Sequence, residues 1–300
     1  MIPPALVKRA ILVFVDGLGL GPDDPAINPI HSGACPHLER LLKEHTVPID
    51  ASMGVPGLPQ SATGTTAILT GINAAQIAKR HQEGFPKREL REILRKHNIF
   101  WQLASRGFTS TFANAYFVDE MSDVEQGRFQ SATTVAALSA FGRVRDKAML
   151  ERNEAVCQDL TRESLSARGY TGPLVSPAEA AGHLVAIARQ YRFTLFEYFQ
   201  TDRAGHRGDA GDVRRVLSIL DGFLGRLGDL AAEENILVAV TSDHGNIEEM
   251  SGHTHTLNPV PFVAVGPGAD ALRRRVKTVV DVTPAILNWV GTRTAGPVAQ

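Results

Sequence analysis

Acidic residues follow three apolar runs of this sequence, each at the point where a strand is expected to end. Asp16 comes directly after AILVFV, Asp202 follows FTLFEYFQ, and Asp243 follows ILVAVTS. Ligands of open α/β sheets bind beyond the carboxyl ends of the strands, so these three side chains are expected to meet at one edge. Carboxylates brought together raise one another's pKa unless a cation offsets their charge. The pattern therefore predicts a cation site.

Histidines occur in the same loops and add nitrogen ligands to this predicted site. Four of the ten flank the expected strand ends: His206, His244, His253 and His255. One of them, His206, lies four residues after Asp202, close enough to share an ion if the backbone turns helically. A single Asp or His at such a place is more often a cap or an exposed residue. Together at one edge they predict a metal site, and mixed carboxylate and imidazole ligands suit zinc, manganese or iron better than calcium.

A run of small and hydroxyl-bearing residues, GLPQSATGTTAILTG at 57–71, leads into an expected helix. One helix cap would account for Ser61 or Thr63 alone, but not for the whole stretch. A serine in such a turn presents its hydroxyl near a positive helix end, and beside a metal it becomes a nucleophile. A phosphoryl group is the expected electrophile, because paired metals hold the attacking and leaving oxygens in line.

Short apolar runs alternate with amphipathic stretches along the chain. Strands are expected at 10–15, 193–200, 236–242 and 261–266, and helical patterns at 36–44, 89–106, 176–190 and 213–233. The third helical pattern opens with Ser176, Pro177 and Glu179, the residues of a capping box. This alternation predicts an α/β fold with a mostly parallel central sheet and helices on both faces.

Residues 116–173 interrupt the alternation, because their apolar periodicity is weak. We expect a small insertion or cap there, on a catalytic core made of residues 1–115 and 174–300. A long irregular connection is the alternative.

The composition bears on which partners the protein could bind and where in the cell it could work. The net charge of −1 gives no reason to expect a nucleic-acid or membrane partner. Cys35 and Cys157 are the two cysteines and form no disulfide framework. The apolar run at 10–15 is too short to span a membrane, so a cytoplasmic location is expected. The oligomeric state stays open.

The motifs resemble those of the alkaline phosphatase superfamily, and most closely its branch of cofactor-independent phosphoglycerate mutase and phosphopentomutase. The matching segments occur in the family's order: VFVDGLGLG (13–21), GLPQSATGTTAILTG (57–71), TDRAGHRGD (201–209), TSDHGNIEE (241–249) and HTHTLNPVPF (253–262). They span most of the chain outside 116–173. The resemblance implies an alkaline-phosphatase-like core that binds two divalent metal ions, manganese or zinc, with magnesium as an alternative.

The resemblance also implies which residues hold these ions. One ion would be held by Asp16, Ser61, Asp243 and His244, and the other by Asp202, His206 and His255. The family's nucleophile precedes a glycine by three residues and a closing glycine by ten, which fits Ser61 rather than Thr63. The family's histidine ligand lies six residues before the last proline of NPVP, which fits His255. His253 is then a neighbour of the site or a substrate contact.

The implied activity is hydrolysis of a phosphoric ester of a small metabolite through a phosphoserine at Ser61. Candidate phosphate contacts are Asn114, Arg128, Arg143 and Arg145. The chain lacks the large inserted domain of bacterial phosphoglycerate mutase and its arginine-rich substrate motif. A reduced cap favours water as the second acceptor, so a phosphomutase or phosphotransferase is the alternative.

Three further classes of protein fit the residues less well. A sulfatase needs a C/S-x-P-x-R context, whereas Ala-Thr-Gly follows Ser61. A nucleotide-binding module could use GLGLG as a phosphate loop, but its spacing is not GxGxxG, and Asp16 would face the phosphate. A non-catalytic binding protein on the same fold would not need all seven presumed ligands.

Overall fold

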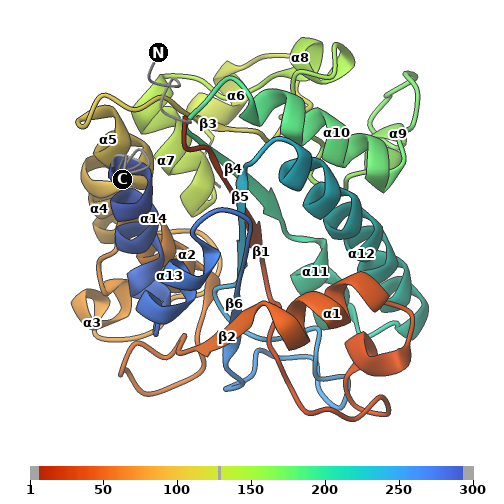
Figure 1. Cartoon of the computed structure of the whole chain (residues 1–300). Coiled ribbons are helices and arrows are strands. Elements are labelled where there is room, and N and C mark those ends of the chain that lie inside the picture. Colours follow the sequence, from red (N-terminus) through yellow and green to blue (C-terminus); the bar gives the residue numbers. More distant parts are fainter. Residues whose placement is uncertain (1–6, 128–129, 293–300) are drawn as a thin grey trace, which may run out of the picture.

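A six-stranded sheet forms the centre of the molecule in the computed structural model, which describes residues 7–127 and 130–292 (Figure 1). Its strands are β1 (Ala10–Val15), β2 (Thr46–Ile49), β3 (Ser110–Phe112), β4 (Phe193–Tyr198), β5 (Leu237–Thr241) and β6 (Val260–Val265). Their order in the sheet is β2-β6-β5-β1-β4-β3. The pairs β3–β4, β4–β1 and β1–β5 are parallel, whereas β6 runs antiparallel to β5 and to β2. The predicted α/β fold with a mostly parallel sheet is confirmed, and β2 and β3 are edge strands that the sequence analysis missed.

Helices connect the strands, and those in the predicted patterns 36–44, 176–190 and 213–233 lie close to the expected bounds. They are α1 (Pro36–Glu44), α2 (Ser61–Thr70), α3 (Ala74–Ala78), α4 (Arg88–His97), α5 (Ile99–Ala104), α6 (Ser122–Glu125), α7 (Ala132–Phe141), α8 (Lys147–Glu151), α9 (Glu163–Ser166), α10 (Pro177–Ala188), α11 (Gln200–Arg207), α12 (Ala210–Glu233), α13 (Ala269–Arg275) and α14 (Val282–Gly291). Two short 3₁₀ helices lie at Pro29–Ser32 and Val279–Asp281. The capping box predicted at the start of α10 is present. None of the helices in the described ranges combines the length and apolar character needed to cross a bilayer.

The helical pattern at 89–106 is divided into α4 and α5 at Asn98. The Asn98 side chain accepts a hydrogen bond from the main-chain N–H of Trp101 at 3.1 Å and donates one to the carbonyl of Leu94 at 2.7 Å. It therefore starts one helix while satisfying a carbonyl near the end of the other. Apolar periodicity continues across this break, so the sequence pattern did not reveal it.

Strand β1 shows how the sheet separates two hydrophobic cores. Leu12 and Phe14 point into the core that contains residues of α2, α4, α5, α7 and α14. Ile11 and Val13 point the other way, into the core beneath α1, α10 and α12. Figure 1 shows these two helix groups on opposite sides of the sheet. Because β1 is buried on both faces, it reads as an uninterrupted apolar run.

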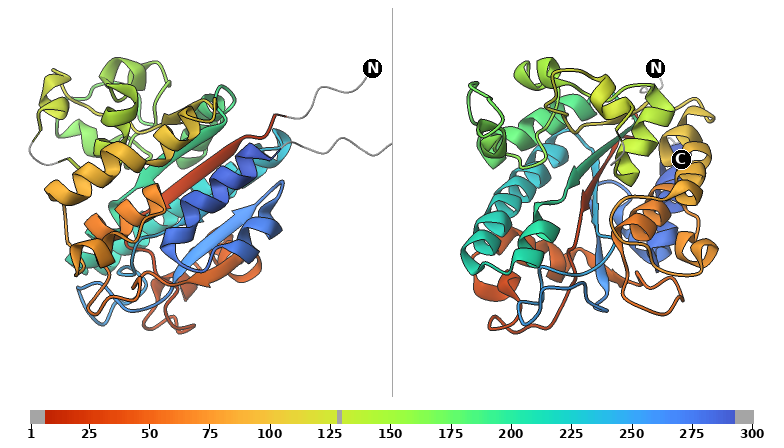
Figure 2. Two further views of the ribbon diagram at one scale, coloured as in Figure 1. Left: turned by 90° about the vertical axis from the view of Figure 1, so that its left-hand side faces the viewer. Right: turned by 180° about the vertical axis from the view of Figure 1, so that it is seen from behind.

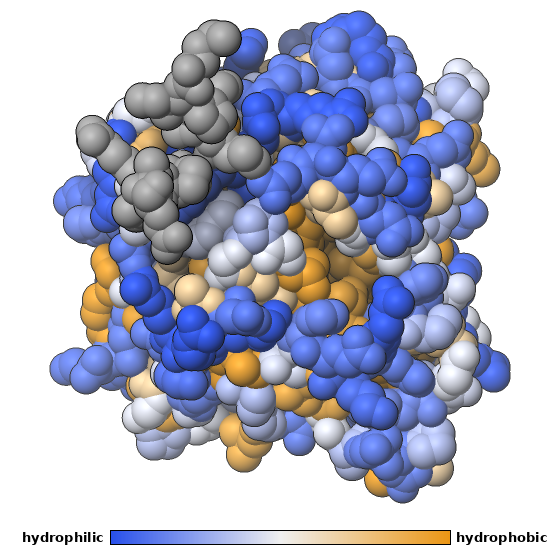
Figure 3. Space-filling view, viewed as in Figure 1, coloured by the Kyte–Doolittle hydropathy of each residue, from blue (hydrophilic) through white to orange (hydrophobic). Residues whose placement is uncertain are grey.

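On the face of the molecule seen in Figure 3, hydrophilic residues predominate and hydrophobic ones gather towards the middle.

Residues 116–173 pack in two ways. Helix α7 contributes to the core shared with α2 and α4, whereas Phe117, Leu150 and Leu165 belong to a separate small hydrophobic cluster. Figure 2 shows the yellow-green part of the chain gathered at one end of the molecule. The division of the chain into a core and an insertion stays a prediction.

Candidate metal centre

The carboxyl ends of three adjacent parallel strands bring the predicted carboxylates together. Strand β1 lies between β5 and β4 in the sheet, so Asp16 lies between Asp243, which follows β5, and Asp202, which lies on α11 after β4. Asp243 and its neighbour His244 are completely buried. The meeting of these side chains at one sheet edge follows from the order of the strands.

His244 is the centre of a first group of potential ligands. Its Nε2 atom lies 2.9 Å from Ser61 Oγ. The same atom lies 3.3 Å from Asp16 Oδ1 and 3.7 Å from Asp243 Oδ2. Ligand atoms bound tetrahedrally at 2.0–2.2 Å from a metal ion are about 3.3 to 3.6 Å apart. These atoms are therefore spaced as the ligands of one ion would be.

His206, His255 and Asp202 form a second group with the same spacing. The two Nε2 atoms are 3.1 Å apart, and they lie 3.4 Å (His206) and 3.5 Å (His255) from Asp202 Oδ1. The imidazole of His255 also stacks on that of His244, with 3.6 Å between ring centroids. Atoms of Asp202, His244 and His255 lie within 4.8 Å of one another, so the two groups are contiguous.

The histidine rings of the second group are oriented for ligation. Nδ1 of His206 lies 2.9 Å from the carbonyl oxygen of His253, and Nδ1 of His255 lies 2.9 Å from that of Pro59. A carbonyl oxygen accepts a hydrogen bond, so each Nδ1 carries the N–H of the neutral ring and each Nε2 carries a lone pair. Two lone pairs facing each other at 3.1 Å repel unless a cation lies between them. This orientation fits a metal ion.

The charges of the cluster give a second test of that fit. Oδ1 of Asp16 is buried and has no hydrogen-bond partner among the described residues. Burial, followed by the negative charges of Asp243 and Asp202, raises the pKa of Asp16 well above its ordinary value. Burial alone would lower the pKa of His244, but Asp243 and Asp16 raise it to about 10. The protein atoms alone thus favour extra protons here, and a divalent cation would supply the missing positive charge instead.

Neighbouring polar groups hold the carboxylates in place. Asn246 Nδ2 donates to Asp202 Oδ1 at 2.7 Å, and Thr65 Oγ1 donates to Asp243 Oδ2 at 2.9 Å. Burial by itself would raise the pKa of Asp202, but the adjacent imidazole of His255, the hydrogen bond from Asn246 and the charge of His244 lower it to about 2. Gly17 has φ +70°, and a Cβ there would lie 2.9 Å from Asp202. The loop after β1 can therefore approach α11 only because it carries glycine.

The hydroxyl groups of α2 have different partners. Ser61 is the first residue of the helix, and its half-buried hydroxyl faces His244. Thr63 instead donates to the carbonyl of Gln60 at 3.1 Å and accepts from the main-chain N–H of Gln82 at 3.2 Å. Of these two hydroxyls, only that of Ser61 contacts the cluster. The stretch thus presents one serine to the cluster and uses Thr63 to hold the helix start in place.

The candidate substrate contacts lie in different places. Asn114 lines the pocket beside the cluster, and its amide pairs with the main chain of Glu197, donating at 2.7 Å and accepting at 2.8 Å. Arg143 and Arg145 border a separate depression, where Arg145 donates to the carbonyl of Phe112 at 3.1 Å. The structure does not bring these two arginines to the cluster. Arg128 lies outside the described residues.

His253 lies next to the cluster rather than in it. Its side chain is exposed and packs against Gly208, where a Cβ would collide with the ring. Its carbonyl oxygen is the group that orients His206.

Two buried glutamates around the centre were missed by sequence reasoning. Glu248 is completely buried and accepts hydrogen bonds from the loop after β1 and from the β5–β6 loop. Glu197 lies in β4, and its carboxylate accepts a hydrogen bond from Thr133 Oγ1 at 2.7 Å. A glutamate inside the apolar run FTLFEYFQ was a signal that could have found it.

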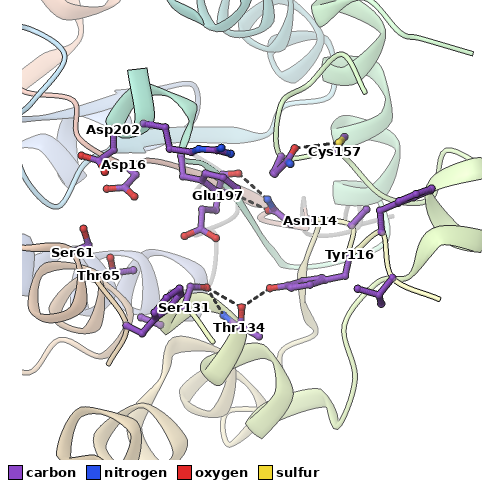
Figure 4. Close-up of a pocket in the computed structure, with 18 of the residues that line it drawn as sticks. Asp16, Ser61, Thr65, Asn114, Tyr116, Ser131, Thr134, Cys157, Glu197 and Asp202 are labelled. Atoms are coloured by element: carbon purple, nitrogen blue, oxygen red, sulfur yellow. Dashed lines mark hydrogen bonds between the residues drawn. The ribbon is translucent and has the colours of Figure 1, made fainter. Parts of the chain in front are cut away.

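A pocket of about 520 Å³ opens beside the cluster. Figure 4 shows Ser61, Asp16 and Asp202 at one end, Tyr116 and Cys157 at the other, and the Glu197 carboxylate between them. Ser61 is therefore accessible to a small molecule bound in this pocket.

Comparisons with known proteins concern the family and the fold of the chain. The family model of the Metalloenzyme superfamily matches residues 8–294. The 2,3-bisphosphoglycerate-independent phosphoglycerate mutase of Cereibacter sphaeroides is 35% identical over 127 residues, which make up 40% of this chain and 25% of that protein. This chain thus matches only about a quarter of the length of that relative.

Two solved structures share the fold. Alkaline phosphatase from the Antarctic bacterium TAB5 aligns with a TM-score of 0.60 and 15% identity over 94% of this chain and 98% of that one. Phosphoglycerate mutase of Leishmania mexicana aligns with a TM-score of 0.51 and 13% identity over 98% of this chain and 97% of that one. At such low identity the likeness concerns the fold alone.

Proposed function

The chain belongs to the Metalloenzyme superfamily, and on that premise we propose that it is a metal-dependent hydrolase of phosphoric esters that works through a phosphoserine at Ser61. The substrate is a small phosphorylated metabolite. One observation carries the proposal: the Ser61 hydroxyl, at the first residue of α2, faces both the pocket and the ligand cluster, 2.9 Å from His244 Nε2. A hydroxyl so placed beside a cation site is a nucleophile for phosphorus.

We assign two divalent ions to the cluster. Asp16, Ser61, Asp243 and His244 hold one, and Asp202, His206 and His255 hold the other. When bound, such ions favour the deprotonated form of a serine oxygen and offset the charge of a phosphoryl group. Manganese and zinc suit these mixed ligands, and magnesium is the alternative.

The residues of the chain account for the two chemical steps. In the first, Ser61 Oγ forms a bond to phosphorus while the ester P–O bond breaks, and the leaving alcohol takes up a proton. In the second, water attacks the phosphorus of phosphoserine, the Oγ–P bond breaks, and phosphate leaves as Ser61 regains its proton. Asn246 and Thr65 keep Asp202 and Asp243 oriented throughout, through their hydrogen bonds of 2.7 and 2.9 Å.

Phosphomutase activity is the second candidate, favoured by the similarity to the Cereibacter sphaeroides mutase over 127 residues. In that case phosphoserine returns its phosphoryl group to another hydroxyl of the organic intermediate. Water as the acceptor gives free phosphate, whereas a hydroxyl acceptor gives an isomer of the substrate.

The test is phosphate release from a panel of phosphomonoesters with manganese or zinc, comparing the parent chain with Ser61→Ala. Thr63→Val is the matched control, because the Thr63 hydroxyl bonds to the main chain rather than to the cluster. We expect release from the parent and from Thr63→Val, and none from Ser61→Ala. Isomerisation without release would favour the mutase. Equal release from all three proteins would contradict a serine nucleophile.

A further inference from the structure

The end of the pocket opposite Ser61 is lined by apolar side chains. Phe117, Leu150 and Leu165 line the pocket and belong to the same small hydrophobic cluster as Cys157. Figure 4 shows Cys157 and Tyr116 on the side away from Ser61, Asp16 and Asp202. We call this end, defined by Phe117, Leu150, Cys157 and Leu165, the apolar chamber. Leu150 and Leu165 are almost fully buried, so the chamber is part of a packed cluster.

Away from the ligand cluster, the polar groups of four lining residues are already paired within the protein: Asn114, Tyr116, Ser131 and Thr134. The amide of Asn114 pairs with the main chain of Glu197. The hydroxyl of Tyr116 lies 2.5 Å from Thr134 Oγ1, which in turn lies 2.8 Å from Ser131 Oγ (Figure 4). The hydroxyls of a sugar or polyol lose their water partners when buried, and this loss is costly unless the wall replaces them. The wall therefore disfavours a polyhydroxylated substrate.

The charges around the pocket disfavour a second anionic group. The cations among the described lining residues are Arg168 and Arg203, and both are exposed. Arg168 donates to the carbonyl of Phe117 at 2.6 Å, and Arg203 adjoins Asp202 in the chain, at the Ser61 end. The carboxyl of Glu197 lies between the two ends of the pocket (Figure 4). A carboxylate reaching the chamber, such as that of phosphoglycerate, would pass this acidic group and meet no buried cation among the described lining residues. The completely buried Arg162 is not one of them, and its guanidinium donates to the hydroxyl of Tyr170 at 2.9 Å.

We propose that the substrate is a phosphomonoester of an apolar alcohol, with its phosphoryl group at Ser61 and its hydrocarbon part in the apolar chamber. This inference rests on the proposed function, and it names the substrate class of the same site. The volume of about 520 Å³ lies within the range of pockets that enclose small organic ligands. Cleavage of the P–O bond releases the apolar alcohol, and water supplies the hydroxyl that remains on phosphate.

The test compares esters whose alcohols have similar leaving-group strength. With metal added, kcat/KM is measured for 3-phenylpropyl phosphate, butyl phosphate, glycerol 3-phosphate and 3-phosphoglycerate. Burying a phenyl group favours the first ester over glycerol 3-phosphate by about 10- to 100-fold. Equal or reversed preference, with phosphate still released, overturns the inference and leaves the proposed function standing.

Val118→Arg tests the apolar lining next to the chamber, because Val118 follows Phe117, is half-buried, lines the pocket and packs against the core that contains α7. The positive charge of the introduced arginine should reduce the preference for 3-phenylpropyl phosphate over glycerol 3-phosphate by about tenfold. Leu174→Arg, at an exposed leucine outside the pocket, is the matched control and keeps the preference of the parent. An unchanged preference in folded Val118→Arg contradicts the proposal.

A binding measurement separates the two proposals if no ester is cleaved. Calorimetry of the metal-loaded parent chain compares 3-phenylpropylphosphonate with methylphosphonate, neither of which can be hydrolysed. Binding of the phenyl compound that is tighter by tenfold or more, about 1.4 kcal/mol, supports the apolar chamber even where the proposed function fails. Equal affinities, or no binding of either phosphonate, overturn the inference.

Discussion

Glu248 accepts a hydrogen bond from the main-chain N–H of Gly19 at 2.9 Å and so ties the loop after β1 to the loop after β5. The same carboxylate accepts from the N–H of Asn246 at 2.7 Å, from Thr256 Oγ1 at 2.6 Å and from Asn258 Nδ2 at 3.1 Å. A Cβ at Gly19 would collide with it. One buried carboxylate thus connects the loop that carries Asp16 to two parts of the β5–β6 loop, those that carry His244 and His255, and it acts on the candidate metal centre by positioning them.

Replacing this carboxylate should loosen the loops. Glu248→Gln puts an NH₂ group in place of one acceptor oxygen, so at least one of the four donors loses its partner. We expect the free energy of unfolding to fall by about 2 to 4 kcal/mol, and metal to be retained less well. Urea denaturation and metal analysis measure both effects. Glu249→Gln, at the less buried neighbour, should change stability by less than about 0.5 kcal/mol, and equal losses in the two variants would argue against the positioning role.

Gly64 should be required for the close approach of α2 to Asp243. A Cβ at Gly64 would lie 2.8 Å from the Cβ and from the carbonyl oxygen of Asp243. Gly64→Ala is therefore expected to displace Asp243 and to weaken metal binding at least tenfold. The matched control is Gly182→Ala in α10, where a Cβ meets no atom within 4 Å and where alanine favours the helix by about 1 kcal/mol. Metal titration of both variants checks this, and tight binding by Gly64→Ala would refute it.

The carboxylates of the centre could be predicted from sequence because each follows an apolar run. A strand end fixes one edge of a parallel sheet, so Asp16, Asp202 and Asp243 could be expected at one edge before any contact was known. Their grouping with particular histidines came from the family resemblance. The role of Glu248 could not be predicted, because it depends on which loops pack together and not on local pattern.

The long, buried strands β1, β4, β5 and β6 were predictable, since burial on both faces makes them uniformly apolar. The edge strands were not. Strand β3 has three residues, and β2 contains Pro48, which an edge strand tolerates because one side of it needs no hydrogen bonds. Such short segments carry too little pattern to distinguish them from loops.

Removing metal should destabilise the protein, since Asp16 Oδ1 has no hydrogen-bond partner within the described ranges and the two histidine Nε2 lone pairs face each other. An ion at 100 times its Kd contributes about 2.7 kcal/mol, so chelation should lower Tm by about 5 to 10 °C. Added manganese or zinc should restore it. His206→Ala should reduce this dependence on metal, whereas His253→Ala, at an exposed neighbouring side chain, should retain it. A Tm unaffected by chelation in the parent chain would count against the metal centre.

Glu197 predicts a specific pH dependence of stability. Burial raises the pKa of this carboxyl from 4.5 to about 7; the hydrogen bond from Thr133 opposes that rise, and the charge of Asp243 adds to it. The folded chain therefore binds this proton more tightly than the unfolded chain does. The contribution of this proton to stability is complete below pH 4.5 and is lost as pH rises through about 7.

Glu197→Gln should remove this loss, so the variant should be more stable than the parent by about 2 to 3 kcal/mol at pH 8. Urea denaturation between pH 5 and 8, with chelator present to keep metal occupancy constant, measures the difference. Glu89→Gln, on the exposed face of α4, should follow the parent curve. Parallel curves for Glu197→Gln and the parent would show that the Glu197 carboxyl does not carry this pH dependence.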